Sequence, residues 1–173
     1  MTITARIEAQ DKGSNPLSRP RRTTLLAVHL LASVGAVGVD VALAALGAWG
    51  VRGADPRVVY PAMDLVATSI LVPLAVVALI SGLVLAITAR WGLVTYWWVV
   101  IKLAITATLT VVALLVVVPG LDAAAAAAAE PAGHVSDAAR LRAAAAPLIA
   151  TGLLTLNVVL GTAKPRWRVR RSA

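Results

Sequence analysis

Four apolar stretches, each long enough to cross a lipid bilayer, constrain this chain more than any other feature of its sequence. A hydrocarbon core about 30 Å thick needs roughly 20 helical residues at a rise of about 1.5 Å each. The stretches cover residues 24–51, 63–89, 95–118 and 143–163. Backbone groups in lipid must be bonded within their own segment, and the sequence lacks the ten-residue alternation of barrel strands. We therefore predict an all-α fold, a bundle of four transmembrane helices.

The composition agrees with a membrane protein and excludes several kinds of chemistry. Hydrophobic residues make up 60% of the 173-residue chain and charged residues only 14%, a balance unlike that of soluble domains. The absence of cysteine excludes disulfides, thiolate nucleophiles and cysteine-held metal sites. A net charge of +8 would suit nucleic acid, but the basic residues flank the apolar stretches. That placement indicates a lipid bilayer as partner and no nucleic acid.

The distribution of lysine and arginine predicts the orientation of the chain. The more basic side carries Arg6, Lys12, Arg19, Arg21, Arg22, Arg90, Lys164, Arg166, Arg168, Arg170 and Arg171. The other side carries only Arg52, Arg57, Arg140 and Arg142. By the positive-inside rule both termini are predicted to be cytoplasmic. Residues 1–23 and 164–173 are then basic cytoplasmic tails, the first disordered, that bind anionic lipid headgroups.

The longest connection, residues 119–142, is rich in alanine and is predicted to lie outside the cell. Alanine favours helix but offers too little apolar surface to fix one in place. We therefore expect a mobile outer loop or a frayed surface helix. Asp64, at the predicted outer start of the second span, is expected to cap the amide groups of that helix.

Asp40 is the most informative polar residue, because it interrupts the otherwise apolar first span. A carboxylate there costs about 2.5–3.5 kcal/mol on insertion scales, so it should face a neighbour or a polar cavity rather than lipid. Small residues share its side of the helix and predict a helix-packing face: Ala32, Ala36, Ala44, Gly47 and Ala48. Two interpretations stay open. Asp40 is either a proton, cation or partner-subunit site, or it forms an interhelical hydrogen bond with serine, threonine or asparagine.

Three further polar groups complete the candidate intramembrane site. His29 shares the face of Asp40 but lies about 16 Å away along the helix axis, so the two cannot bond directly. We expect His29 to bond to a headgroup, with proton exchange, metal binding or haem ligation as alternatives. Lys102 is expected to reach the interface by snorkelling, or to pair with a carboxylate or anionic headgroup. Asn157 is the strongest uncharged hydrogen-bonding group in any span.

The sequence offers no catalytic, cofactor-binding or metal-binding constellation. His29 and His134 are predicted at opposite membrane faces, so one haem would need two copies of His29 from a dimer or a ligand such as Met63. Copper and zinc would need clustered ligands that the chain does not place together. There is neither a Ser-His-Asp arrangement nor a phosphate-binding glycine loop. We therefore expect no cofactor and favour a non-enzymatic role.

Between Ala27 and Pro119 the chain resembles a family of small predicted four-span integral membrane proteins of unknown function from high-GC Gram-positive bacteria. The matching motifs are His29 with Ser33-Val34-Gly35, Ala62-Met63-Asp64-Leu65, Val72-Pro73-Leu74, Ser81-Gly82-Leu83, Arg90-Trp91-Gly92-Leu93, Tyr96-Trp97-Trp98-Val99 and Lys102-Leu103. Ala36 stands where such sequences often have tryptophan. A weaker similarity runs to the copper-resistance membrane proteins, but the additional histidines and methionines of a copper path are missing. The resemblance implies four spans in a bacterial inner membrane and no particular activity.

Three functions follow as candidates. The first, which we favour from the sequence, is a non-enzymatic membrane subunit or accessory protein that associates through the glycine and alanine face. Its partner would be a second copy of the chain or another membrane protein. The second is an oligomeric small-solute or proton-coupled transporter that uses Asp40. The third is a haem or copper redox membrane protein.

Overall fold

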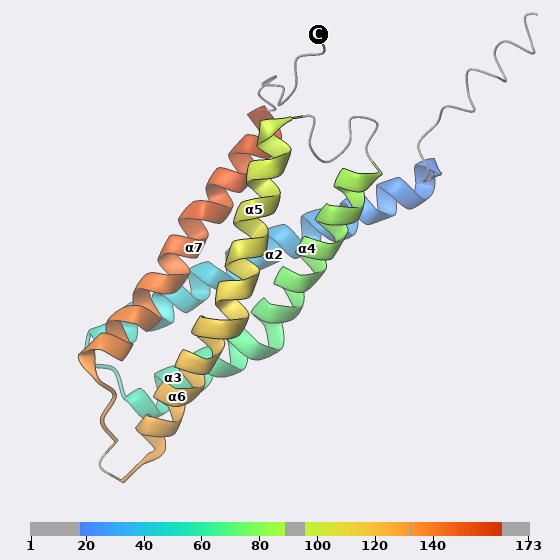
Figure 1. Ribbon diagram of the computed structural model, residues 1–173. Coiled ribbons are helices and arrows are strands. Elements are labelled where there is room, and N and C mark those ends of the chain that lie inside the picture. The colour runs from blue at the N-terminus through green and yellow to red at the C-terminus, as the bar shows by residue number, and fades with distance from the viewer. Residues whose placement is uncertain (1–17, 89–95, 132, 164–173) are drawn as a thin grey trace, which may run out of the picture.

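The computed structural model describes residues 18–88, 96–131 and 133–163, and it is all-helical across these ranges (Figure 1). Its helices that are long and apolar enough to cross a membrane are Arg19–Val51, Pro56–Ile87, Trp97–Ala129 and Asp137–Thr162. The predicted all-α class with four membrane-length helices is confirmed. The predicted tails at residues 1–17 and 164–173 and the turn at 90–92 lie outside the described residues.

Two of the four long helices contain a π-helical turn. The elements in chain order are α2 (Arg19–Val51), α3 (Pro56–Val66), η1 (Ala67–Leu71), α4 (Val72–Ile87), α5 (Trp97–Val112), η2 (Ala113–Val117), α6 (Val118–Ala129) and α7 (Asp137–Ala163). Each π-helical turn ends two residues before a proline, Pro73 or Pro119. Proline has no N–H and crowds the preceding turn, and a locally wider turn accommodates both effects. Pro73 is thus accommodated by η1.

The first and second helices begin earlier than predicted. α2 starts at Arg19 with Pro20 in its first turn, so residues 19–23 are helical and not part of a disordered tail. α3 starts at Pro56, and the side chain of Asp55 accepts a hydrogen bond from the Arg57 amide at 2.9 Å. The expected cap at Asp64 is therefore wrong. Asp55 before Pro56 is the stronger start signal, because it combines a capping acid with proline at the first helical position.

The alanine-rich segment is not a loop over its first half. α6 continues the third long helix to Ala129, and its buried residues Leu121, Ala124 and Ala128 join one apolar core with Tyr60 and Met63 of α3. Alanine leaves room for α6 to approach α3 closely, and the larger side chains of α3 fill the contact. Of the two expectations for residues 119–142, the mobile loop is wrong for residues 119–129 and the helix is right in type, but α6 is packed against α3 rather than frayed. The alanines by themselves do not identify their partner helix.

α2 and α7 touch most closely at Gly47. A Cβ placed on Gly47 would lie 2.6 Å from Ala144 Cα and 2.9 Å from the Ala143 carbonyl oxygen. Residue 147, four positions after Ala143, is a proline inside α7, so it has no N–H to donate to that carbonyl. The glycine therefore lets α2 lie against the backbone of α7 where a helix carbonyl lacks its usual partner.

The predicted helix-packing face is largely buried within the chain. Ala32, Ala36, Ala44 and Gly47 are buried and Ala48 is half-buried. These residues pack inside the bundle formed by one copy of the chain, so they do not present a free surface to another subunit.

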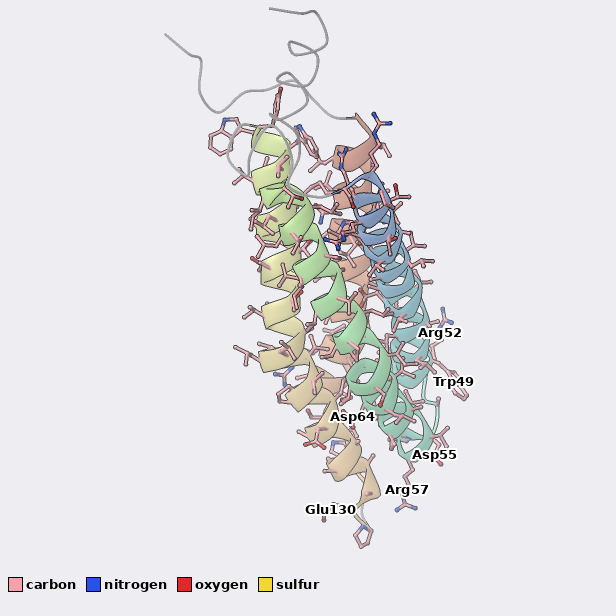
Figure 2. All side chains as sticks on the ribbon, turned by 90° about the vertical axis from the view of Figure 1, so that its right-hand side faces the viewer. Trp49, Arg52, Asp55, Arg57, Asp64 and Glu130 are labelled. Carbon is pink, nitrogen blue, oxygen red and sulfur yellow. The ribbon has the colours of Figure 1, made fainter. Side chains whose placement is uncertain are left out.

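Two arginines close helix ends at the end of the bundle that holds Arg52, Asp55 and Glu130 (Figure 2). Arg57 donates to the carbonyl oxygens of Ala128, Glu130 and Pro131 after the end of α6, at 3.2–3.4 Å. Arg140 donates to Gly50, near the end of α2, at 3.1 Å. A cation at a helix C-terminus satisfies unbonded carbonyls and complements the helix dipole. Half of the four arginines on the predicted outer side are thus engaged in holding helix ends.

Replacing Gly47 by alanine should lower the stability of the bundle by about 1–3 kcal/mol, the usual cost of overpacking, because the added methyl would overlap the α7 backbone. Thermal unfolding in detergent, followed by circular dichroism, measures the change. The matched control is Gly38→Ala on the same helix, where an added Cβ meets nothing within 4 Å. Equal melting temperatures for the two variants would contradict the close contact.

Candidate intramembrane site

A cavity of about 280 Å³ lies inside the bundle between α2, α4, α5 and α7. α2 and α7 meet near Gly47 and diverge from there toward the end at which α2 begins (Figure 1). Most of the cavity wall is leucine, valine and alanine, and the polar residues among the lining are His29, Ser33, Asp40, Lys102, Thr106, Thr110 and Asn157. All four residues of the predicted intramembrane site therefore line one cavity.

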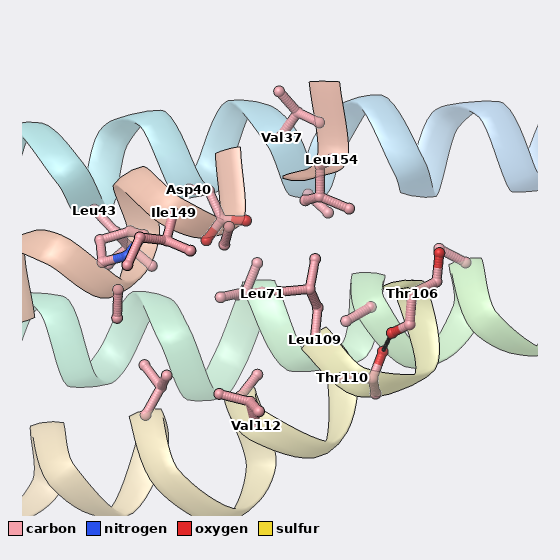
Figure 3. A pocket seen from close by; sticks show the side chains of 18 of the residues that line it. Val37, Asp40, Leu43, Leu71, Thr106, Leu109, Thr110, Val112, Ile149 and Leu154 are labelled. Carbon is pink, nitrogen blue, oxygen red and sulfur yellow. Dashed lines mark hydrogen bonds between the residues drawn. The ribbon is translucent and has the colours of Figure 1, made fainter. Parts of the chain in front are cut away.

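Asp40 is buried and unpaired. Its exposed fraction is 3%, and it has no hydrogen bond or ion pair with any residue in the described part of the chain. Figure 3 shows the side chain projecting from α2 into the cavity, with Leu71 across from it. The predicted interhelical hydrogen bond to a serine, threonine or asparagine is absent among the described residues. Buried side-chain polar groups usually have a partner, so an acid without one is the least expected feature of this interior.

His29 joins α2 to α4. Its Nδ1 lies 3.0 Å from the Ala78 carbonyl oxygen and 3.1 Å from Ser81 Oγ. A carbonyl only accepts hydrogen bonds, so Nδ1 carries the proton and donates, which leaves the lone pair on Nε2. The ring also lies against Gly82, where an added Cβ would come within 2.9 Å of its Cε1. The expected bond to a headgroup is therefore wrong, because His29 bonds inside the bundle.

Lys102 and Asn157 fasten α5 to α7. The Lys102 ammonium donates to the Asn157 carbonyl oxygen at 2.9 Å. Asn157 Nδ2 donates in return to the Lys102 carbonyl oxygen at 3.3 Å and to Thr106 Oγ1 at 2.8 Å. Gly161 makes this possible, because an added Cβ there would lie 2.7 Å from Lys102 Nζ. The expected snorkelling of Lys102 and its alternative, a carboxylate partner, are both wrong for this structure.

Polar side chains continue from Asp40 toward the end of the bundle where α5 begins. Thr110, Thr106 and Lys102 follow one another at four-residue spacing along α5, and all three line the cavity. Figure 3 shows the two threonines. The two threonine hydroxyls donate to carbonyls of their own helix, at 2.8 and 2.9 Å. Thr106 Oγ1 also accepts from Asn157 Nδ2, whereas the lone pairs of Thr110 Oγ1 remain for other donors. The Asn157 Oδ1 atom is buried with no hydrogen-bond partner in the described residues. The cavity thus offers an acid and several acceptors.

The opposite end of the bundle is closed by apolar side chains. Val59, Tyr60, Met63 and Val135 are at most 1% exposed and belong to the same core cluster as Leu43 and Leu121. The Tyr60 hydroxyl is buried there without a hydrogen-bond partner in the described residues. The polar groups therefore lie on one side of Asp40 and an apolar core on the other.

Four residues of this site were not predicted individually from the sequence: Thr106, Thr110, Ser81 and Gly82. The spacing of Thr106 and Thr110 after Lys102 was visible in the sequence, and it places all three on one helix face. Ser81 and Gly82 were noted only as part of the Ser81-Gly82-Leu83 motif, yet in the structure they form the contact surface for His29. Among the described residues, no group of three or more His, Cys, Asp or Glu side chains is arranged to hold a metal ion.

Comparison of the chain with protein-family models, curated proteins and solved structures finds no match. The resemblance to the four-span family therefore stays a prediction. The structure by itself establishes an all-helical chain with four helices of membrane-spanning length around a cavity that holds an unpaired acid.

Replacing Asp40 by asparagine should leave the thermal stability of the protein unchanged or raise it, because the acid has no partner to lose. The matched control is Asn157→Leu, which removes hydrogen bonds to Lys102 and Thr106. It should cost about 1 kcal/mol, as interhelical hydrogen bonds in membranes do. Melting temperatures measured in detergent compare the stability of the two variants. If the Asp40 variant were the less stable of the two, Asp40 would be a structural residue.

Proposed function

We propose that this protein is an integral membrane carrier that binds a proton or small cation at Asp40. The observation that carries the proposal is a buried carboxyl group with no partner among the described residues, facing a cavity inside the bundle. Acidic residues in transmembrane helices are rare, and they commonly mark ion and proton pathways.

The charge of the Asp40 carboxylate suits it to exchange a proton for a cation. An ionised carboxylate without a partner is costly in an apolar interior. The group is therefore neutralised either by its own proton or by a bound cation, and one can replace the other without changing the net charge of the cavity. That competition is the basis of coupled exchange between a proton and a cation.

The asymmetry of the bundle supports a carrier. Polar groups lead from Asp40 toward the end where α2 begins and α7 ends, while the apolar core around Tyr60 and Met63 closes the other end. Carriers bind their substrate near the middle of the membrane and expose it to one side at a time. A single chain already provides one such half-path, so the oligomer predicted for the transporter is not required to form it.

The other two candidate functions gain no such support. The subunit or accessory role was based on the glycine and alanine face, which packs within the chain. Association with a partner would need a different surface. A copper or haem redox role would need further ligands near His29, and among the described residues no group of three or more His, Cys, Asp or Glu side chains is arranged to hold a metal ion. His134 lies in the connection after α6.

Proton flux into liposomes that contain the protein tests the carrier. With an outward gradient of a small cation imposed and a pH-sensitive dye inside, the unmodified protein should acidify the interior faster than protein-free liposomes, because each cation that leaves is exchanged for an entering proton. Asp40→Asn should reduce this rate at least tenfold. Asp64→Asn is the matched control, because Asp64 is an acid in the next long helix that does not line the cavity, and it should keep the rate. No flux above protein-free liposomes, or equal flux in the Asp40 variant, would contradict the proposal.

We also propose that the protein lies in the bacterial inner membrane with both termini in the cytoplasm, where the basic tails bind anionic lipid. The charge distribution supports this orientation. The chain has no cysteine, so single-cysteine variants test it directly. In intact cells an impermeant maleimide should label His134→Cys, an exposed residue between α6 and α7. It should label Ser172→Cys only after the membrane is permeabilised. The reverse pattern would invert the orientation.

A further inference from the structure

One side of the cavity lies close to the outer surface of the bundle. Three of its lining residues are also exposed on the outside: Val112 of α5 by 39%, and Ile149 and Val158 of α7 by 62% and 46%. These residues show where the cavity comes nearest to the outer surface, which is between α5 with η2 and α7. An opening on this side is part of the proposal below. In a bilayer this outer surface faces acyl chains, so such an opening would admit a ligand dissolved in lipid.

The cavity wall on this side suits an apolar molecule. Ala113 of η2 and Ala146 and Ala150 of α7 belong to it, and such small side chains leave room for passage. The cavity volume of about 280 Å³ is that of about nine water molecules at roughly 30 Å³ each, close to the lower limit of small-molecule pockets. A chain of some eight carbon atoms with a small headgroup falls in this range of size.

The charges inside the cavity favour a cation. Asp40, His29 and Lys102 are its titratable lining groups, from α2 and α5; the lining residues of α4, α7 and the π-helical turns contribute none. The Lys102 ammonium already donates to the Asn157 carbonyl and His29 to the Ala78 carbonyl, whereas Asp40 is without a partner among the described residues. The group that lacks a partner is the acid, so a ligand gains most by bringing a positive charge to it.

We propose that the cavity binds small lipophilic ammonium ions that enter from the lipid between α5–η2 and α7. The ammonium pairs with the Asp40 carboxylate and the alkyl chain occupies the apolar part of the cavity. The proton that neutralised Asp40 in the empty site leaves as the ammonium arrives. This inference rests on the proposed function for the role of Asp40 and adds to it the class of ligand and its route of entry.

Three probes of equal chain length separate charge from hydrophobicity: n-octylammonium, 1-octanol and octanoate. Ligands that bind the folded state raise its melting temperature, so thermal unfolding of the purified full-length protein is the measurement. Octylammonium should raise the melting temperature by several degrees and octanol by less, with no increase from octanoate. Asp40→Asn should reduce the octylammonium shift to that of octanol. A larger shift with octanoate would assign binding to the Lys102 end instead and overturn the proposal, as would equal shifts for the amine and the alcohol.

Two variants of α7 test the route. Ala150→Trp obstructs this side of the cavity and should slow the association of octylammonium at least tenfold, because a blocked route changes the rate of binding. Leu148→Trp, on the same helix at an exposed residue outside the lining, should keep the association rate of the unmodified protein. Ala113→Leu narrows the same side from η2 and should also slow association, which keeps the test informative if the tryptophan at 150 prevents folding. Unchanged association rates in both lining variants would overturn lateral entry.

The flux and binding experiments distinguish the two proposals. If the protein conducts protons through Asp40 but octylammonium produces no more stabilisation than octanol, the ligand class proposed here is wrong and the carrier remains. If neither Asp40-dependent flux nor Asp40-dependent binding is found, both proposals fail.

Discussion

The contact of Gly47 with the backbone of α7 determines where this bundle is closed and where it is open. Because the glycine has no side chain and Pro147 removes a donor from α7, the two helices meet backbone to backbone beside Ala143 and Ala144. Beyond that contact they diverge (Figure 1), and side chains of four helices only partly fill the space between them. Asp40 lies in α2 seven residues before the contact, so its carboxyl group meets the resulting cavity rather than a packed neighbour.

The two oppositely charged groups in the cavity have different roles. Lys102 is bonded to α7 through Asn157 and helps to hold two helices together, as His29 does for α2 and α4. Asp40 does not hold two helices together, because it has no hydrogen-bond partner among the described residues. Proteins commonly retain groups that cost stability where function requires them. The two other titratable groups of the cavity, His29 and Lys102, are both hydrogen-bonded, and Asp40 is not, among the described residues. A binding role explains this difference and a packing role does not.

The sequence predicted features that depend on a single helix, but it did not predict features that depend on contacts with another helix. Length and hydropathy predicted four membrane-length helices, and helical spacing placed Asp40 on the buried side with Ala36 and Gly47. The partners of His29 and Lys102 lie 49 to 55 residues away in the chain, and nothing in either local sequence identifies them. The same limit explains α6, whose alanines are fixed by Tyr60 and Met63 of another helix. The orientation, which depends on charges at the chain ends, stays a prediction.

The central claim is that Asp40 faces a cavity inside the bundle and not the lipid. Because the chain has no cysteine, the claim can be tested with two neighbouring single-cysteine variants in lipid vesicles and a small cationic methanethiosulfonate reagent. Asp40→Cys should react, since the cavity admits water and cations. Val41→Cys, whose side chain is 52% exposed on the outside of the bundle, should stay unmodified, because lipid suppresses the thiolate. Reaction at position 41 with none at position 40 would contradict the account.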